Sequence, residues 1–317
     1  MKGKKVLFFD SDRKACRIAE RAIAATGSSI ETIRNERNLF QRSDLEHFDL
    51  IILSLEHEKD WSRTFEDIEK HADGTKLLLN ISSPADEYIP MMTEKTYLRN
   101  LIAKSDGPLD TEEIIVTTEK IFREDIFGLD KYMMWGVEPV AIKVTDSKDK
   151  AKYIGEVSQY ATRLGCPPRA VELVETVTDE FVTNAVFNAP RDENGNPKYA
   201  HLNRRESVTL SPEEQAELYY CCDGRFLCVA QRDPFGALTR ETVINYLARC
   251  LKGGPGQILY SSGGAGLGLF RVFKSLSKFI INLCPGTMTE VIALIDLRVN
   301  MKKFKQYPKS LHFFQRD

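Results

Sequence analysis

The chain has 317 residues, of which 42% are hydrophobic and 28% are charged, a balance typical of globular proteins that bury a core. A formal net charge of -2 excludes a general attraction to nucleic acid, and no apolar run approaches the roughly 20 residues that span a bilayer. This length favours two domains, and the short apolar stretch after the basic N-terminus indicates a first strand and not a signal peptide.

Short apolar runs alternate with helical periodicity over residues 1–124. The sequence predicts strands at residues 6–9, 50–53, 76–79 and 101–103, and helices at residues 12–25 and 110–122. Gly27 closes the first helix, and a Gly107-Pro108 turn precedes the second. Strands that are apolar throughout and alternate with helices predict an α/β domain with a doubly wound parallel sheet.

The ends of these strands carry residues by which the domain resembles a response-regulator receiver domain. Asp10 and Asp12 follow the first strand, where receivers hold magnesium with an acidic cluster, and Lys104 stands at the place of the receiver lysine. Ser54 stands where receivers carry the phospho-accepting aspartate. A serine hydroxyl is a poor nucleophile at its free pKa, and it cannot ligate magnesium as a carboxylate does.

Two further positions bear on this resemblance. Asn80 and Ser82 bracket the place of the receiver's switch hydroxyl, and Ser105 replaces the proline that usually follows the lysine. We therefore interpret residues 1–124 as a pseudo-receiver domain that does not take phosphate. The alternative is an unrelated flavodoxin-like domain without a switch.

The pattern changes after a connector at residues 125–138, whose large apolar side chains predict a packed segment. The sequence then predicts a strand at residues 140–144, a helix at 148–165, a long helix that ends at Asn188, and strands at 218–222 and 225–231. Asp223-Gly224 between the last two strands predicts a two-residue hairpin. Helices followed by antiparallel strands predict an α+β two-layer sandwich.

The long helix carries the first of three chemical motifs. Glu180, Asn184 and Asn188 are spaced four residues apart, which places them on one helix face. A carboxylate one turn from an amide suits a nucleotide site, because the amide oxygen can ligate a magnesium ion that bridges phosphates and the carboxylate can accept a proton. On its own, such a pair is more typical of a solvated helix face.

The second and third motifs follow in the chain. Asp233 ends a strand, where its carboxylate can accept a hydrogen bond from an adenine amino group, and Gly236 would leave room for the base. Without the other motifs, the sequence Asp233-Pro234 would indicate only an ordinary turn. Gly264, Gly266 and Gly268 open a helix whose backbone N–H groups attract an anion, and neither a Walker A loop nor a dinucleotide fingerprint fits them.

The order of these motifs, completed by Thr289 before a terminal strand, resembles the Bergerat-type ATPase domain of histidine kinases, gyrase-type enzymes and anti-sigma-factor serine kinases. The resemblance covers residues 139–298 and implies ATP and Mg²⁺ as cofactors. It implies that Glu180 is the general base and that Asn184 holds Mg²⁺ through the nucleotide phosphates. It assigns nucleotide contacts to Asn184, Asn188, Asp233, Gly236, Gly264, Gly266, Gly268 and Thr289.

The chain departs from the family pattern at several positions. Phe235 and Ala237 replace two glycines of the adenine motif, and Asn188 stands where the kinases often have histidine. The loop at residues 191–201 is unusually polar and long. These departures argue against catalytic turnover more than they argue against the expected fold.

The leading hypothesis is a cytoplasmic, bacterial-type signalling regulator that binds ATP and magnesium and is coupled to the pseudo-receiver. The resemblance implies serine or threonine kinase activity on a regulatory protein partner. The alternative is a non-catalytic adaptor whose degenerate ATPase fold serves as a protein-binding scaffold. A complete histidine kinase is disfavoured, because no dimerisation helix with a phospho-accepting histidine precedes residue 139. Whether the protein forms a homodimer stays open.

Two remaining features bear on partners and location. Residues 299–317 form a basic aromatic tail that could stack on bases, although such tails more often dock on their own domain. We therefore expect neither nucleic acid nor a membrane as partner. The seven cysteines lack the spacing of a metal site, and we expect reduced structural thiols in the cytoplasm.

Overall fold

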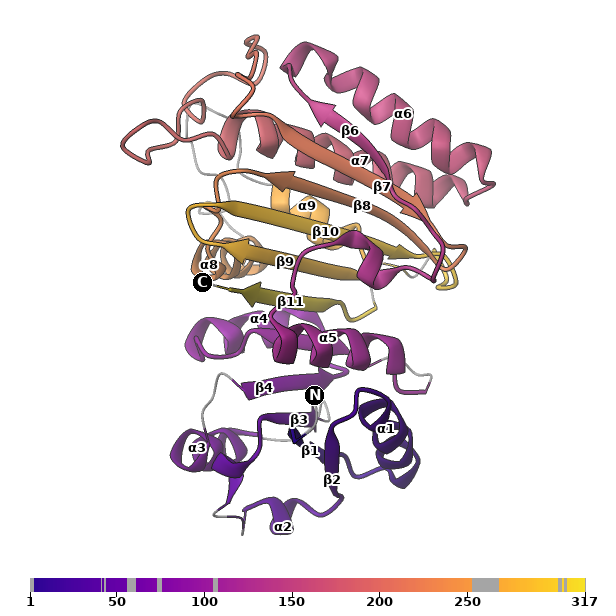
Figure 1. Cartoon of the computed structure of the whole chain (residues 1–317), viewed down its shortest axis with the longest axis vertical. Helices are drawn as coiled ribbons and strands as arrows, with labels where there is room; N and C mark the ends of the chain where they lie inside the picture. Colours follow the sequence, from indigo (N-terminus) through magenta and orange to yellow (C-terminus); the bar gives the residue numbers. More distant parts are fainter. Residues whose placement is uncertain are drawn as a thin grey trace. The chain divides into compact units, whose positions relative to one another are not determined.

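The computed structural model describes residues 3–40, 42, 44–55, 61–72, 76–104, 108–252, 268–301, 304 and 307–316. The chain divides into two compact units, each treated by itself below (Figure 1). Unit 1 consists of Met1–Ile126 with Pro308–Phe314, and unit 2 of Phe127–Tyr307 with Gln315–Asp317. Among the described helices, none combines the length and the apolar character needed to cross a membrane.

The sheet of unit 1 is parallel except for its last strand. Its described strands are β1 (Lys5–Phe9), β2 (Ser29–Ile33), β3 (Leu50–Leu55), β4 (Leu77–Ile81), β5 (Asn100–Ala103) and β11 (Ser310–Gln315). The order is β2-β1-β3-β4-β5, all parallel, and β11 pairs antiparallel with β5. Every residue of β3 and β4 is buried, as expected for parallel strands covered on both faces.

Helices connect the strands of unit 1. They are α1 (Arg13–Ala25), α2 (Glu36–Phe40), α3 (Ser62–His71), α4 (Ala85–Glu94) and α5 (Thr111–Arg123), with a 3-10 turn at Leu45–His47. Asp12 caps the N-terminus of α1 by accepting a hydrogen bond from the Lys14 N–H at 2.8 Å. α1 packs beside α5, and one core cluster joins Val6, Phe8, Cys16, Ala19, Ile23, Leu50, Ile52, Leu78, Ile102 and Ile114.

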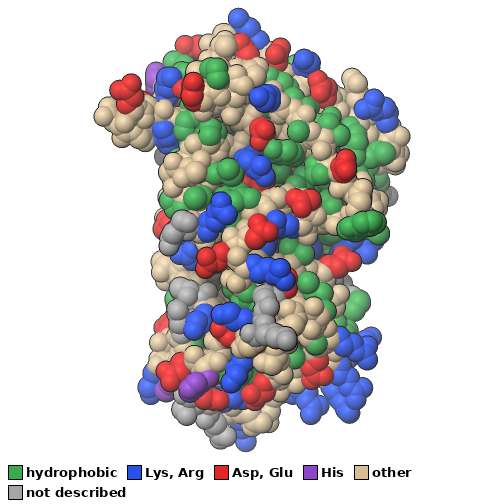
Figure 2. Space-filling model, viewed as in Figure 1, with side chains coloured by type: hydrophobic (Ala, Val, Ile, Leu, Met, Phe, Trp, Pro, Cys, Tyr) green, Lys and Arg blue, Asp and Glu red, His purple; other side chains and the backbone are tan. Residues whose placement is uncertain are grey.

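The parallel pairing that the apolar runs predict is observed, with two strands added. The edge strand β2 and the C-terminal strand β11 were not among the predicted strands. Residues 310–315 therefore lie in a sheet, and the expected tail at residues 299–317 does not extend freely over this stretch. Phe313 and Phe314 are only 3% and 4% exposed, so neither ring is available to stack on bases. Basic and acidic side chains are interspersed over unit 2 on the face drawn in Figure 2.

The sheet of unit 2 is antiparallel. Its described strands are β6 (Val140–Val144), β7 (Ala216–Cys222), β8 (Phe226–Asp233), β9 (Lys278–Cys284) and β10 (Met288–Asp296), in the order β9-β10-β8-β7-β6. Residues 223–225 connect β7 to β8, one residue more than the predicted Asp223-Gly224 turn, and Gly224 has a positive φ of +88°. Thr289 lies inside β10, between β8 and β9, and not before a terminal strand.

The helices of unit 2 are α6 (Lys150–Arg163), α7 (Pro168–Thr183), a π-helical turn at Asn184–Asn188, α8 (Arg240–Lys252) and α9 (Gly268–Lys274). α7 packs on β8 and β10 and lies beside α6 and α9 (Figure 1). The predicted long helix thus reaches Asn188, but its last five residues are π-helical. In the connector at residues 125–138, the Gly128 N–H donates to the buried Glu290 carboxylate at 2.8 Å.

Candidate functional site

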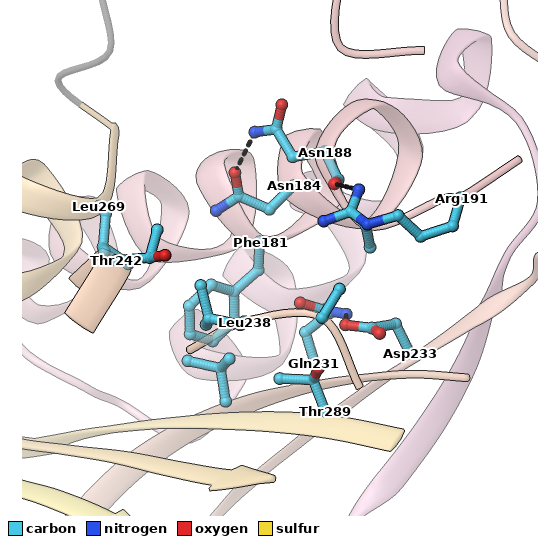
Figure 3. A pocket seen from close by; sticks show the side chains of 13 residues that line it. Phe181, Asn184, Asn188, Arg191, Gln231, Asp233, Leu238, Thr242, Leu269 and Thr289 are labelled. Carbon is cyan, nitrogen blue, oxygen red and sulfur yellow. Dashed lines mark hydrogen bonds between the residues drawn. The ribbon is translucent and has the colours of Figure 1, made fainter. Parts of the chain in front are cut away.

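The C-terminal end of α7 and the ends of two sheet strands enclose a cavity of about 330 Å³ in unit 2 (Figure 3). The cavity is lined by Phe181, Asn184, Asn188, Ala189, Arg191, Gln231, Asp233, Ala237, Leu238, Thr242, Leu269, Thr289 and Val291. Four residues that the sequence assigns to a nucleotide site therefore share one cavity: Asn184, Asn188, Asp233 and Thr289. They come from one helix and two strands, and the volume is within the range of small-molecule sites.

Amide side chains form the helical wall of the cavity. The Asn188 Nδ2 donates to Asn184 Oδ1 at 2.6 Å, and the Arg191 guanidinium donates to the Asn188 carbonyl at 2.7 Å. Figure 3 shows both asparagine side chains on the helix, with Arg191 beside them. An amide oxygen has two lone pairs, so Asn184 Oδ1 keeps one for a further donor or a cation. This wall is suited to phosphate-bound magnesium.

The opposite wall carries Asp233, the last residue of β8. Its carboxylate is 6% exposed and accepts hydrogen bonds from Gln231 Nε2 and the Phe235 N–H, each at 3.1 Å. Thr289 is its partner across the sheet. Burial raises the pKa of the Asp233 carboxyl, and the hydrogen bonds from Gln231 and Phe235 oppose this effect. The remaining lone pairs of the carboxylate can accept a hydrogen bond from an amino group of a bound base.

Glu180 lies one turn before Asn184, outside the cavity lining. Its side chain is 13% exposed, and Oε1 lies 3.3 Å from a guanidinium nitrogen of Arg271. Burial raises the pKa of the Glu180 carboxyl and the charge of Asp179 adds to this rise, while Arg271 acts in the opposite direction. A carboxylate whose pKa is raised is a stronger base than an ordinary carboxylate, which favours proton acceptance.

The described part of the glycine segment begins at Gly268, the first residue of α9. A Cβ atom at this position would lie 2.0 Å from Glu180 Oε2, so a larger residue would require the Glu180 side chain to move. Gly264 and Gly266 lie outside the described residues. Leu269 lines the cavity, which places the start of α9 at its edge.

Gly236 lies against the turn between β9 and β10. A Cβ atom there would lie 2.1 Å from the Cys284 carbonyl oxygen and 2.6 Å from the Thr287 nitrogen. With a φ of +59°, Gly236 is required by the backbone of this turn. Its expected contact with a base stays a prediction.

Gln231 and Arg191 are among the cavity residues that the sequence did not predict. Gln231 stands two residues before Asp233 on β8, so the period of two in a strand places both on one face and could have found it. Arg191 follows the π-helical turn in an irregular loop, and no periodicity marks it.

In unit 1, the predicted receiver positions come together at the ends of β1, β3 and β4. Lys104 Nζ donates to Ser54 Oγ at 3.1 Å and lies 3.2 Å from Asp10 Oδ2, and Asn80 Nδ2 also donates to Ser54 Oγ at 3.1 Å. Asp12 is separate, because its carboxylate caps α1. The hydroxyl at position 54 is buried and held by two donors, in place of a carboxylate.

Within the described part of the chain, no group of three or more His, Cys, Asp or Glu side chains is arranged to hold a metal ion. The described cysteines of both units are free thiols, as expected.

No protein-family model matches the chain, and a search of the curated proteins found no relative. Among solved structures, the chain is similar to the solution NMR structure of a de novo designed Rossmann 2x3 fold protein. The two are 19% identical, with a TM-score of 0.29, over 38% of this chain and 90% of the designed one. A likeness this distant supports no argument about function, and the chain is placed by its own structure in the general class of mixed α/β proteins.

Proposed function

We propose that unit 2 is a Bergerat-type ATPase domain that binds ATP with magnesium, and that unit 1 is a pseudo-receiver to which it is coupled. The observation that carries this proposal is the cavity in which Asn184, Asn188, Asp233 and Thr289 meet. Side chains up to 105 positions apart in the sequence, from 184 to 289, converge there in the roles that one motif order implies. If the asparagines of the helix and the Asp-Pro turn were unrelated to a binding site, we would not expect them to line the same cavity.

In this proposal each wall recognises one end of the nucleotide. The buried Asp233 carboxylate accepts the adenine amino group, with Thr289 beside it on β10. Phe181 and Leu238 supply apolar surface to the base. Asn184 would hold a magnesium ion that enters with the nucleotide, and the start of α9 at Gly268 would face the phosphate end.

We further propose that the site serves phosphoryl transfer to a serine or threonine of a regulatory protein partner. Mg-ATP supplies the phosphoryl group and the electrostatic stabilisation of its transfer. Glu180 accepts the proton of the attacking hydroxyl, for which the raised pKa of its carboxyl is suited. Arg271 must then leave the carboxylate, and its side chain is 61% exposed and so can do so without breaking a packed core.

A non-catalytic scaffold is the second candidate, and one observation favours it. The Glu180 carboxylate contacts Arg271 and abuts Gly268, an arrangement that shields it from a hydroxyl. Transfer of labelled phosphate from ATP to a partner, lost in Glu180→Gln, supports the kinase. Nucleotide binding without any transfer supports the scaffold.

Calorimetric titration of the full chain with Mg-ATP tests the proposed binding. We expect Asp233→Ala to weaken ATP binding by about tenfold or more, because a buried hydrogen bond to a charged group is lost. We expect Asn184→Ala to weaken ATP binding only when magnesium is present. Glu241→Ala, which removes an exposed carboxylate at the start of α8, is the matched control. Equal affinities of all four proteins, or no binding at all, would reject the proposal.

A further inference from the structure

Arg204, in the irregular segment between Asn188 and β7, places a positive charge against Asn188 of the helical wall, although Arg204 does not itself line the cavity. Its guanidinium stands 4.7 Å from the centre of the Phe187 ring, and its Nη2 donates to Asn188 Oδ1 at 2.8 Å. Asn188 in turn donates to Asn184, so a chain of hydrogen bonds leads from Arg204 to the proposed magnesium ligand.

The second guanidinium nitrogen of Arg204 is buried and has no hydrogen-bond partner among the described residues. Burial lowers the pKa of the Arg204 guanidinium, and only the charge of Glu180 acts in the opposite direction. A buried charged donor without a partner is costly, and structures keep such a group where a ligand or bound water satisfies it.

Other cations near Glu180 already have a carboxylate partner. Arg271 pairs with Glu180 itself, and Lys150 Nζ lies 2.7 Å from Asp179 Oδ1. Arg204 contacts an amide and an aromatic ring, and no carboxylate within salt-bridge distance is found for it among the described residues. Arg191 also has no carboxylate within salt-bridge distance among the described residues, but its guanidinium donates to the backbone carbonyls of Asn188 and Pro190. Arg204 is therefore the cation beside Asn188 that keeps a donor nitrogen without a partner in the described part of the chain.

The loop that carries Arg204 is held in place by its own hydrogen bonds. Asp192 accepts from the backbone of Asn194 and Asn196, and Lys198 pairs with Glu214 at 2.6 Å. The Asn203 N–H bonds to the Glu206 carboxylate at 2.7 Å, directly beside Arg204. The guanidinium is therefore positioned before any ligand arrives, which reduces the entropy cost of binding.

We infer that Arg204 binds the terminal phosphate of the nucleotide, an inference that rests on the proposed ATP site. Asp233 recognises the base on the sheet wall, whereas Arg204 is linked to the asparagines that hold the phosphate end. Phe187, which the guanidinium covers, lies three residues after Asn184 and thus on a neighbouring helix face. A guanidinium offers paired donors that match two phosphate oxygens.

The test compares ATP with ADP on the full chain, with magnesium, by calorimetric titration. Loss of the terminal-phosphate contact in Arg204→Ala should weaken ATP binding by about tenfold to a hundredfold, and ADP binding by less than about threefold. Arg204→Lys keeps the positive charge but loses the paired guanidinium donors. Its ATP affinity should fall between those of wild type and Arg204→Ala. Arg205→Ala removes the adjacent exposed arginine and should change neither affinity. Melting temperatures show whether each variant is folded.

Each result decides the inference. Selective loss of ATP affinity in Arg204→Ala, with normal binding in Arg205→Ala, supports it. Equal weakening of ATP and ADP, or unchanged ATP binding, overturns the assignment of Arg204 and leaves the ATP site standing. A wild-type chain that binds neither nucleotide overturns the proposed function and the inference together.

Discussion

The Asp233 carboxylate is buried at the end of β8 with hydrogen bonds from Gln231 and Phe235, and its burial still raises its pKa. A charge held in this way destabilises the folded chain in the absence of a ligand. A bound base that donates a hydrogen bond to this carboxylate would offset the free-energy cost of burying its charge. The same residue should therefore govern affinity and pH-dependent stability.

A carboxyl whose pKa is higher in the folded chain binds more protons when folded than when unfolded. The free energy of unfolding then falls as pH rises from the unfolded pKa near about 4 through the folded pKa. Asp233→Asn removes this loss. Its stability relative to wild type should increase between about pH 4 and pH 7, measured by urea unfolding of the ligand-free proteins. A difference that stays constant over this range contradicts the raised pKa.

Gly236 is a glycine whose backbone both needs a positive φ and approaches a neighbouring turn closely. Gly236→Ala would place a Cβ atom 2.1 Å from the Cys284 carbonyl oxygen at a positive φ. We expect a loss of roughly 2 kcal/mol or more in the free energy of unfolding, measured with urea. Gly195→Ala is the control, because Gly195 also has a positive φ but has nothing within 4 Å of its Cβ position. Equal losses in both variants would show that the close contact is not decisive.

The residues of the candidate site differed in how far the sequence could reveal them. Asn184, Asn188 and Asp233 stand in short local motifs, so the spacing within each motif was enough to identify them as candidate site residues. Arg191 and Arg204 reach the site from an irregular loop, where no period links a position in the sequence to a direction in space. Gly264 and Gly266 lie outside the described residues, and their proposed contact with phosphate stays a prediction.

At the scale of elements, the strands of unit 1 that the sequence predicted are those that are buried on both faces, because burial makes their sequences continuously apolar. β1, β3, β4 and β5 are apolar because both faces are covered, and their runs were read correctly apart from shifts of one or two residues at the ends. β2 is an edge strand with the sequence Ser-Ile-Glu-Thr-Ile, of which Ile33 alone is buried. β11 pairs His312 with Asn100, and no local pattern reports a partner more than 200 residues away.

β11 contributes buried contacts to unit 1. His312 Nε2 lies 2.9 Å from Glu113 Oε1 on α5, and the two side chains are 1% and 2% exposed. The Lys120 ammonium stands 4.0 Å from the centre of the Phe314 ring. The strand therefore fills a core and satisfies a buried carboxylate.

A chain that ends at residue 307 should be less stable than wild type by about 3 kcal/mol or more, because two buried phenylalanines and the partner of Glu113 are lost. A chain that ends at residue 315 keeps β11 and should lose much less. Thermal and urea unfolding of both truncated proteins measure the difference. Equal stabilities would mean that β11 contributes little to unit 1.

At the scale of the whole molecule, each unit has a site of its own: the group of polar side chains around Ser54 in unit 1 and the cavity in unit 2. In unit 1, the Ser54 hydroxyl accepts hydrogen bonds from Lys104 and Asn80. If unit 1 is the proposed pseudo-receiver, any control of unit 2 by unit 1 uses something other than aspartyl phosphate. Incubation of the full chain with acetyl phosphate should leave its intact mass unchanged, and a phosphorylated species at residue 54 would contradict this.

Hydrogen exchange read by mass spectrometry tests most directly whether the cavity of unit 2 binds Mg-ATP. With Mg-ATP, we predict slower exchange in peptides that cover residues 181–191, 229–238 and 288–292, where the helix and strands line the cavity. Asp233→Ala should abolish this protection at the same nucleotide concentration. Exchange that is unchanged in these peptides, or slowed equally in Asp233→Ala, would contradict the account.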